Sequence, residues 1–194
     1  MECNLNSSTR VKRLLVAAVL LMVSPAGGFG AETPAAEAVL TEARATAAVG
    51  HKAIFIHFSA SWCKWCRRLE SFLHDPVVEP VLQRHFVLVR LVVRERDPNK
   101  HLDHAGGMEV LAKLGGAERG IPFMAVLGAD GTMLANSLMK STDPEAKDGV
   151  DNLGYPGDAE SIAHFLGMLR AGAPTMTADE LKVLEDWLVA NTPK

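Results

Sequence analysis

The stretch Ser61-Trp62-Cys63-Lys64-Trp65-Cys66 follows the apolar run Ala53 to Phe58 and precedes a helical pattern that begins at Arg67. This order predicts a strand, a short turn and a helix, with two thiols one helical turn apart at the start of the helix. Cys63 falls at or beside the helix N-cap, where unpaired backbone N–H groups and the positive end of the helix dipole favour an anion. Lys64 adds a nearby cation, so we expect Cys63 to ionise readily and to act as a nucleophile near neutral pH.

Two later segments complete a pattern that resembles the thioredoxin-like family, whose active site is Trp-Cys-x-x-Cys after the central strand. Arg119-Gly120-Ile121-Pro122-Phe123 is similar to the family's loop, in which a cis proline faces the dithiol. Val126 to Thr132, which contains Asp130-Gly131, is similar to its terminal hairpin. The resemblance covers roughly Thr33 to Gly172. A lone Cys-x-x-Cys would be weak evidence, because zinc sites use it too.

This resemblance implies an α/β protein with the thioredoxin-like fold, in which helices flank a central mixed four-stranded sheet. It also implies a thiol-disulfide oxidoreductase, with Cys63 as the attacking thiolate, Cys66 as the resolving thiol and a redox-active disulfide between them. Trp62 and Pro122 are expected to form walls of the peptide site, and the backbone of Ile121 to pair with an extended substrate. No cofactor is expected. The predicted partners are exported proteins with thiols or disulfides, and a redox partner that recycles the dithiol.

His57 stands six residues before Cys63, inside the apolar strand. At this position the thioredoxin-like pattern often carries a buried acid that exchanges protons with the second cysteine. Burial would keep a histidine neutral, which suits a proton acceptor near Cys66. The alternative is a hydrogen-bonded core histidine. We expect Lys64 and His57 to tune the electrostatics of the site.

Two other functions remain open from the sequence. The first is a metal-binding or metallochaperone module in which the same thiolates are joined by His101 and His104. The second is a redox-inert partner-binding domain, which has no need for both thiols. The direction of a redox reaction also stays open, since Lys64-Trp65 matches neither the Gly-Pro of thioredoxin nor the Pro-His of strong oxidants.

Composition limits the class of protein. The chain has 194 residues, of which 48% are hydrophobic, which is enough for one well-filled domain and short for two. We assign residues 33–172 to the thioredoxin-like domain and residues 173–194 to a C-terminal helical extension packed on it. Without residues 1–30 the chain carries 17 basic and 22 acidic residues, a net charge of −5. With no basic cluster left, we expect no nucleic-acid binding.

Residues 1–30 have the pattern of a signal peptide. Three basic residues precede the apolar block Leu14 to Val23, and Pro25 and small residues follow it. A membrane-spanning helix needs about 20 apolar residues, so an uncleaved anchor is the weaker alternative. We expect cleavage near Phe29 or Ala31, a periplasmic or secreted product, and no stable membrane association afterwards. Removal of this segment leaves only Cys63 and Cys66, and a loop this short adds little stability, so the pair points to reactivity.

The remaining pattern predicts the other elements. We expect a helix with Thr33 as N-cap, Pro34 at its first position and Gly50 as C-cap. The strand Ala53 to Ser59 follows it. Further elements are a helix from Cys63, a turn at Asp75-Pro76, a helix over Val77 to His85, a strand over Phe86 to Val93, a polar loop over Arg94 to Gly107, a short helix over Met108 to Leu114, strands over Pro122 to Gly128 and Thr132 to Asn136, and a helix over Ala159 to Arg170.

Two C-terminal segments go beyond the minimal fold. Ser137 to Gly157 is a long polar loop, and we expect Leu153, Gly154 and Tyr155 either to line the partner groove or to belong to a surface insertion. After Pro174, a capping box over Thr177 to Glu180 starts a helix. Its apolar stripe, which we expect to dock on the domain, consists of Leu181, Leu184, Trp187 and Leu188.

Overall fold

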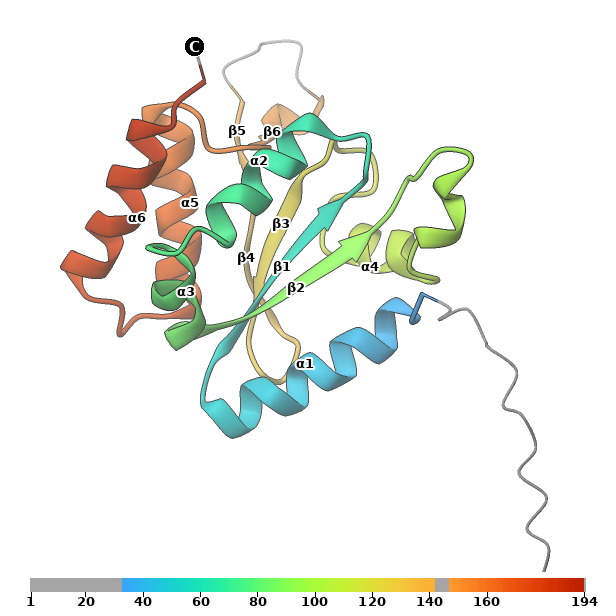
Figure 1. Ribbon diagram of the computed structural model, residues 1–194, viewed down its shortest axis with the longest axis horizontal. Coiled ribbons are helices and arrows are strands. Elements are labelled where there is room, and N and C mark those ends of the chain that lie inside the picture. The colour runs from blue at the N-terminus through green and yellow to red at the C-terminus, as the bar shows by residue number, and fades with distance from the viewer. Residues whose placement is uncertain (1–32, 142–146, 194) are drawn as a thin grey trace, which may run out of the picture. The chain divides into compact units, whose positions relative to one another are not determined.

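The computed structural model describes residues 33–141 and 147–193 (Figure 1). The expected signal peptide lies outside the described residues. The helices are α1 (Ala36–Gly50), α2 (Lys64–Leu73), α3 (Glu79–His85), α4 (Gly107–Lys113), α5 (Ala159–Gly172) and α6 (Ala178–Ala190). The strands are β1 (Ala53–Ser59), β2 (Phe86–Val92), β3 (Phe123–Leu127), β4 (Met133–Asn136), β5 (Leu138–Lys140) and β6 (Val150–Asn152). None of the helices in these residues is long and apolar enough to cross a membrane.

One sheet contains β2, β1, β3 and β4 in that spatial order. Strand β1 runs parallel to β2 and antiparallel to β3, and β4 runs antiparallel to β3. The predicted mixed four-stranded sheet is therefore confirmed. Every residue of β1 is buried, as its continuous apolar sequence indicates for a strand covered on both faces.

Helices cover both faces of this sheet (Figure 1). Residues of α1 and α4 pack with Ile54, Ile56 and Phe58 of β1, whereas residues of α2, α3, α5 and α6 pack with Phe55. Successive side chains of a strand point to opposite faces, so His57 lies on the same face as Phe55, under α2.

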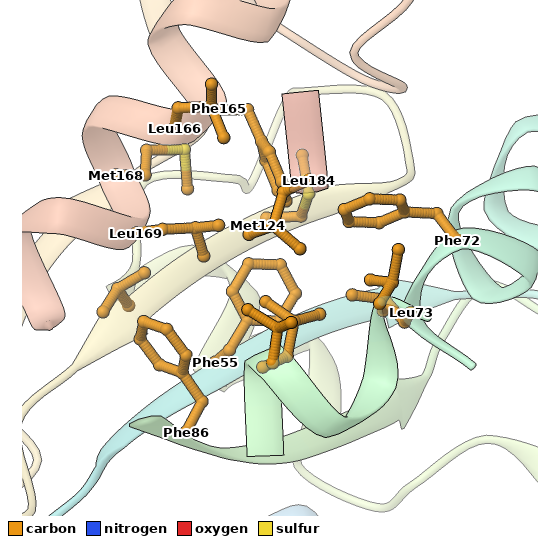
Figure 2. Packing of buried hydrophobic residues seen from close by; sticks show 14 of the residues in the cluster. Phe55, Phe72, Leu73, Phe86, Met124, Phe165, Leu166, Met168, Leu169 and Leu184 are labelled. Carbon is orange, nitrogen blue, oxygen red and sulfur yellow. The ribbon is translucent and has the colours of Figure 1, made fainter. Parts of the chain in front are cut away.

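The core beneath α2, α3, α5 and α6 is rich in aromatic rings (Figure 2). The ring of Phe55 makes edge contacts with Phe86 and Phe165, with centroids 6.4 Å and 5.9 Å apart. Phe72 of α2 contacts Phe165 of α5 in the same way, at 5.7 Å. Each fully buried side chain of this kind contributes about 1.5–3 kcal/mol to stability. This packing fixes α2, and with it the cysteine turn, against the sheet.

The expected C-terminal helix is present as α6, and its apolar stripe faces this core. Leu184 and Leu188 are fully buried, and Leu181 is 5% exposed. The Trp187 ring lies 5.2 Å from that of Phe72. Thr177 and Glu180 form the predicted capping box, in which the Thr177 hydroxyl accepts the Glu180 N–H and the Glu180 carboxylate accepts the Thr177 N–H.

The prediction for the ends of α1 was wrong. The N-cap is Ala35 and makes no side-chain cap, because the Ala36 N–H donates to the carbonyl of Ala105 at 2.8 Å. Thr33 instead donates its hydroxyl to the carbonyl of His101. A distant loop thus supplies the acceptor that we had assigned to a local cap. At the other end the C-cap is His51, with φ of 51°, one residue after the predicted Gly50.

Apart from shifts of one or two residues at the ends of other elements, the structure differs from the prediction in two further segments. Helix α3 starts at Glu79 instead of Val77, since the N–H groups of Val77 and Val78 donate to Asp75 in a turn. Part of the expected loop Ser137 to Gly157 also forms strands. Strands β5 and β6 form a short antiparallel pair. Their sequences show no alternation of apolar and polar residues from which the strands could be predicted.

Candidate functional site

Cys63 and Cys66 lie where β1 passes into α2, as predicted. Cys63 is the N-cap of α2 in an extended conformation, and its Sγ accepts the backbone N–H of Cys66 at 3.1 Å. The two sulfurs are joined in a disulfide. An N–H aimed at Cys63 Sγ, together with the positive end of the helix, stabilises negative charge on this sulfur when the bond is open.

The two sulfurs differ in their access to solvent. Cys63 is 4% exposed and Cys66 is fully buried, so Cys63 is slightly the more accessible. Ile121 packs against both cysteines, and its carbonyl oxygen lies 3.5 Å from Cys63 Sγ. The Ile121–Pro122 peptide bond is cis. A segment 58 residues away in sequence therefore lies beside Cys63 Sγ.

Trp62 is held at the rim of the site. Its indole Nε1–H donates to the carbonyl of Arg94 at 2.8 Å, and the Arg96 guanidinium lies over its ring at 4.2 Å. The ring remains 41% exposed, so one surface is available to a partner. The ammonium of Lys64 lies 5.6 Å from the centroid of the Trp65 ring, at the surface of the turn.

A buried carboxylate that we did not predict braces the cysteine turn. Glu95 is 5% exposed, and its carboxylate accepts the backbone N–H of Ser61 at 2.5 Å and the Ser61 hydroxyl at 2.7 Å. Arg94 next to it has a positive φ of 61° and donates to the carbonyls of Ala117 and Arg119. The loop after β2 thus joins the turn before Cys63 to the segment before Pro122.

His57 lies in a polar group under α2. It is 2% exposed, and neither ring nitrogen has a hydrogen-bond partner among the described residues. Its Nε2 lies 3.7 Å from Oε1 of Glu70, which also accepts the Ser59 hydroxyl and pairs with Arg90. Burial lowers the pKa of His57, so the ring is neutral near pH 7. The interaction with His57, and then those with Ser59 and Arg90, lower the pKa of Glu70 to about 2.

Glu70 was missed in the sequence, although a signal existed. It stands four residues after Cys66, which places it on the side of α2 that carries this cysteine. Glu95 had no such signal, because an acid in a polar loop usually lies in solvent.

The segment Leu153 to Tyr155 reaches the cysteine turn. With Trp65, Ile121 and Pro122 it lines a pocket of about 300 Å³. The Tyr155 ring stacks on Trp65 with centroids 6.0 Å apart.

The two histidines of the metal alternative are occupied elsewhere. His101 Nδ1 lies 3.0 Å from the carbonyl of Pro98, and His104 Nδ1 accepts the Val92 N–H. Across residues 33–141 and 147–193, no three or more His, Cys, Asp or Glu side chains are grouped as metal ligands. The structure does not bring His101 and His104 together with the cysteines.

Comparisons with known proteins agree with this geometry. Residues 35–129 match a family model described as thioredoxin-like. The comparison with curated proteins finds no significant match.

Solved structures give similar proteins at low identity. A disulphide isomerase from Xylella fastidiosa Temecula1 is 26% identical over 52% of this chain and 72% of its own, with a TM-score of 0.44. A DsbH oxidoreductase is 16% identical over 82% and 96%, with a TM-score of 0.42. The oxidised DsbD C-terminal domain of Neisseria meningitidis is 22% identical over 54% and 84%, with a TM-score of 0.37.

Because these TM-scores are below 0.5, the assignment rests on the family model, the sheet order and the disulfide. Through residues 35–129 the chain belongs to the thioredoxin-like family.

Proposed function

We propose that this protein is a thiol-disulfide oxidoreductase that exchanges disulfides with exported proteins through Cys63 and Cys66. The observation that carries the proposal is the position of Cys63 Sγ. It lies at the N-cap of α2, receives the Cys66 N–H, and is bonded to the sulfur of Cys66. A buried disulfide that closes so short a loop adds little stability, so a reactive role explains it better than a structural one.

The reaction needs only the two thiols and a substrate disulfide. The Cys63 thiolate attacks one substrate sulfur, a mixed disulfide forms, and the other substrate sulfur leaves as a thiolate that takes up a proton. The Cys66 thiolate then attacks Cys63 Sγ, which reforms the Cys63–Cys66 disulfide and releases the second substrate thiol. Two electrons pass from the protein to the substrate, and a redox partner must restore them. The same steps in reverse oxidise a substrate dithiol.

Other residues of the site have supporting roles in this proposal. Among the described residues, the Ile121 N–H donates no backbone hydrogen bond, which leaves it free to pair with an extended substrate. Trp62 and Pro122 form walls beside the sulfur, and Lys64 favours the thiolate. His57, neutral and buried under α2, is the proposed proton acceptor for Cys66.

Two variants test the proposal in cells. Cys66→Ala can attack a substrate but cannot resolve the mixed disulfide, so it should accumulate high-mass adducts that disappear on reduction. Cys63→Ala should trap almost nothing, and Cys63→Ala/Cys66→Ala serves as the background. Equal absence of adducts from both single variants on non-reducing gels, with metal bound to the parent protein, would contradict the proposal and favour the metal alternative.

The direction of the reaction follows from a single quantity. Equilibration of the Cys63–Cys66 pair in glutathione buffers gives its reduction potential, and tens of millivolts separate reductants from isomerases and oxidants.

Export is the second part of the proposal. The basic residues, short apolar block and small residues within positions 1–30 support cleavage near Phe29 or Ala31. N-terminal sequencing of the exported protein should find one of these as the first residue. An exported product that begins at Met1 or Glu2 would contradict cleavage.

A further inference from the structure

A pocket lies next to Ile121, whose carbonyl oxygen is 3.5 Å from Cys63 Sγ, and the C-terminal extension builds part of it. The pocket has a volume of about 300 Å³, and its walls include Trp65, Pro122, Leu153, Tyr155, Gly157 and Pro193. These residues come from the cysteine turn, the loop before β3, the segment after β6 and the chain end after α6. Below we call it the side-chain pocket.

Specific contacts hold these walls together. Tyr155 stacks on Trp65, and the Arg68 guanidinium lies 5.3 Å from the centroid of the Tyr155 ring. Arg68 also donates to the carbonyl of Asn191, just after α6. One α2 side chain therefore ties the segment after β6 and the end of the chain to the helix that starts at Cys63. Pro193, two residues after Asn191, comes into the pocket wall as a result.

The surface offered by the side-chain pocket is mainly apolar. The carboxylate of Asp158 at its edge is already used, because it accepts the N–H groups of Glu160 and Ser161 at the start of α5. The other walls are the side chains of Trp65, Tyr155, Pro122, Pro193 and Leu153. Ligand pockets usually occupy about 300–1,000 Å³. A pocket at the lower end of this range suits one apolar side chain better than an organic cofactor.

The location relative to Cys63 indicates where this side chain comes from. Ile121 lines the side-chain pocket, and its carbonyl oxygen is 3.5 Å from Cys63 Sγ. On the other side of Ile121 and Gly154 lies a second, polar hollow of about 490 Å³, which includes Glu118, Arg119 and Asp151. A peptide that pairs with Ile121 and brings its cysteine to Cys63 therefore has an apolar pocket on one side and a polar hollow on the other.

We propose that the side-chain pocket binds a large apolar side chain of the substrate protein, within two residues of its reacting cysteine, and that Pro193 of the C-terminal extension is a specificity-determining residue. The inference rests on the proposed function. It assigns to the extension after α5 a role in substrate choice. Burial of one leucine side chain in the pocket corresponds to a preference of about 10- to 100-fold for a substrate with leucine over one with a small polar residue.

The experiment uses the full-length protein with its dithiol reduced. The substrates are short peptides, each with one cysteine carried as a mixed disulfide with glutathione. Leucine or serine is placed singly at the two positions before and the two positions after the cysteine. We expect leucine at one of these positions to raise the second-order rate constant for reduction at least about tenfold over serine, with smaller effects at the others.

Two variants assign the preference to the pocket. Pro193→Ala removes one wall and should lower the ratio of leucine to serine rates at least about threefold. Gly157→Val fills the pocket, because a Cβ at Gly157 already lies 3.1 Å from Pro193 Cδ, and should lower the ratio further. Pro174→Ala, an exposed proline before α6, is the matched control and should leave the ratio unchanged. Thermal unfolding checks that each variant is folded.

The small substrate 2-hydroxyethyl disulfide separates the two levels of the proposal, because it has no side chain to fill the pocket. Failure to reduce it, together with failure on every peptide, overturns the proposed function and this inference with it. Its reduction, combined with equal rates for leucine and serine peptides at all positions, overturns the pocket alone. A leucine preference that survives in both Pro193→Ala and Gly157→Val overturns its assignment to this pocket.

Discussion

The imidazole Nε2 of His57 lies 3.7 Å from the carboxylate Oε1 of Glu70, on the face of the sheet that α2 covers. His57 belongs to the strand before Cys63, and Glu70 to the helix that begins after it. The Glu70 carboxylate also accepts the Ser59 hydroxyl and pairs with Arg90. A polar group made from β1, β2 and α2 thus lies under the helix that carries Cys66.

Glu70→Gln should lower the free energy of unfolding at pH 7 by about 1 kcal/mol, the scale of a partly exposed ion pair. The pKa of Glu70 falls from its ordinary 4.5 to about 2 in the folded protein. The stabilisation of the folded protein by ionised Glu70 is therefore fully present above about pH 4.5 and is lost as the pH falls toward 2. Denaturant titrations across this range should show a shallower loss for Glu70→Gln. Glu42→Gln, an exposed residue of α1, is the control. Parallel profiles for Glu70→Gln and the parent protein would rule the contribution out.

His57→Ala should slow release of the mixed disulfide while it leaves the first attack by Cys63 nearly unchanged. Only the second step requires Cys66 to lose its proton, and the neutral buried imidazole is the proposed acceptor. Rapid-mixing measurements with a model mixed disulfide separate the two steps. Equal slowing of both steps, with a lower melting temperature, would instead identify His57 as a structural histidine.

Glu95→Ala should destabilise the protein by about 2 kcal/mol, because it leaves the Ser61 N–H and hydroxyl without their charged acceptor. Glu95→Gln keeps one acceptor oxygen and should recover about half of the loss. Chemical unfolding measures both, with Glu42→Ala as the control for removal of an exposed carboxylate. If Glu95→Ala were as stable as this control, the brace on the cysteine turn would have no energetic importance.

Leu184→Ala should lower the free energy of unfolding by about 3 kcal/mol, since Leu184 is fully buried and its removal leaves a cavity. Val189→Ala in the same helix changes a side chain that is 59% exposed and should cost less than about 0.5 kcal/mol. Both variants should unfold in a single transition. A separate early transition for α6 would show that the extension does not share the cooperative unit.

Local sequence determined the architecture and the position of the cysteine pair. The strand before Ser61 and the helix after Cys66 can be predicted from residues close together in sequence. The spacing of their apolar residues indicates which faces are buried. For the same reason the apolar stripe of α6 identified the extra helix correctly. The predicted starts of α1 and α3 were wrong. Their first N–H groups donate to acceptors that the sequence pattern did not identify, namely the carbonyls of Ala105 and Asp75.

Tertiary structure alone decided which polar and C-terminal residues belong to the site. Ser61 and Glu95 are 34 residues apart, and a glutamate in a polar loop gives no sign that the chain will fold donors around it and bury its charge. Trp65 and Pro193 line one pocket, and Arg68 of α2 holds the segment that follows α6 beside it. Burial and pairing are properties of residues brought together from distant parts of the chain. The sequence therefore identified the position of the cysteine pair, and the fold determined what surrounds it.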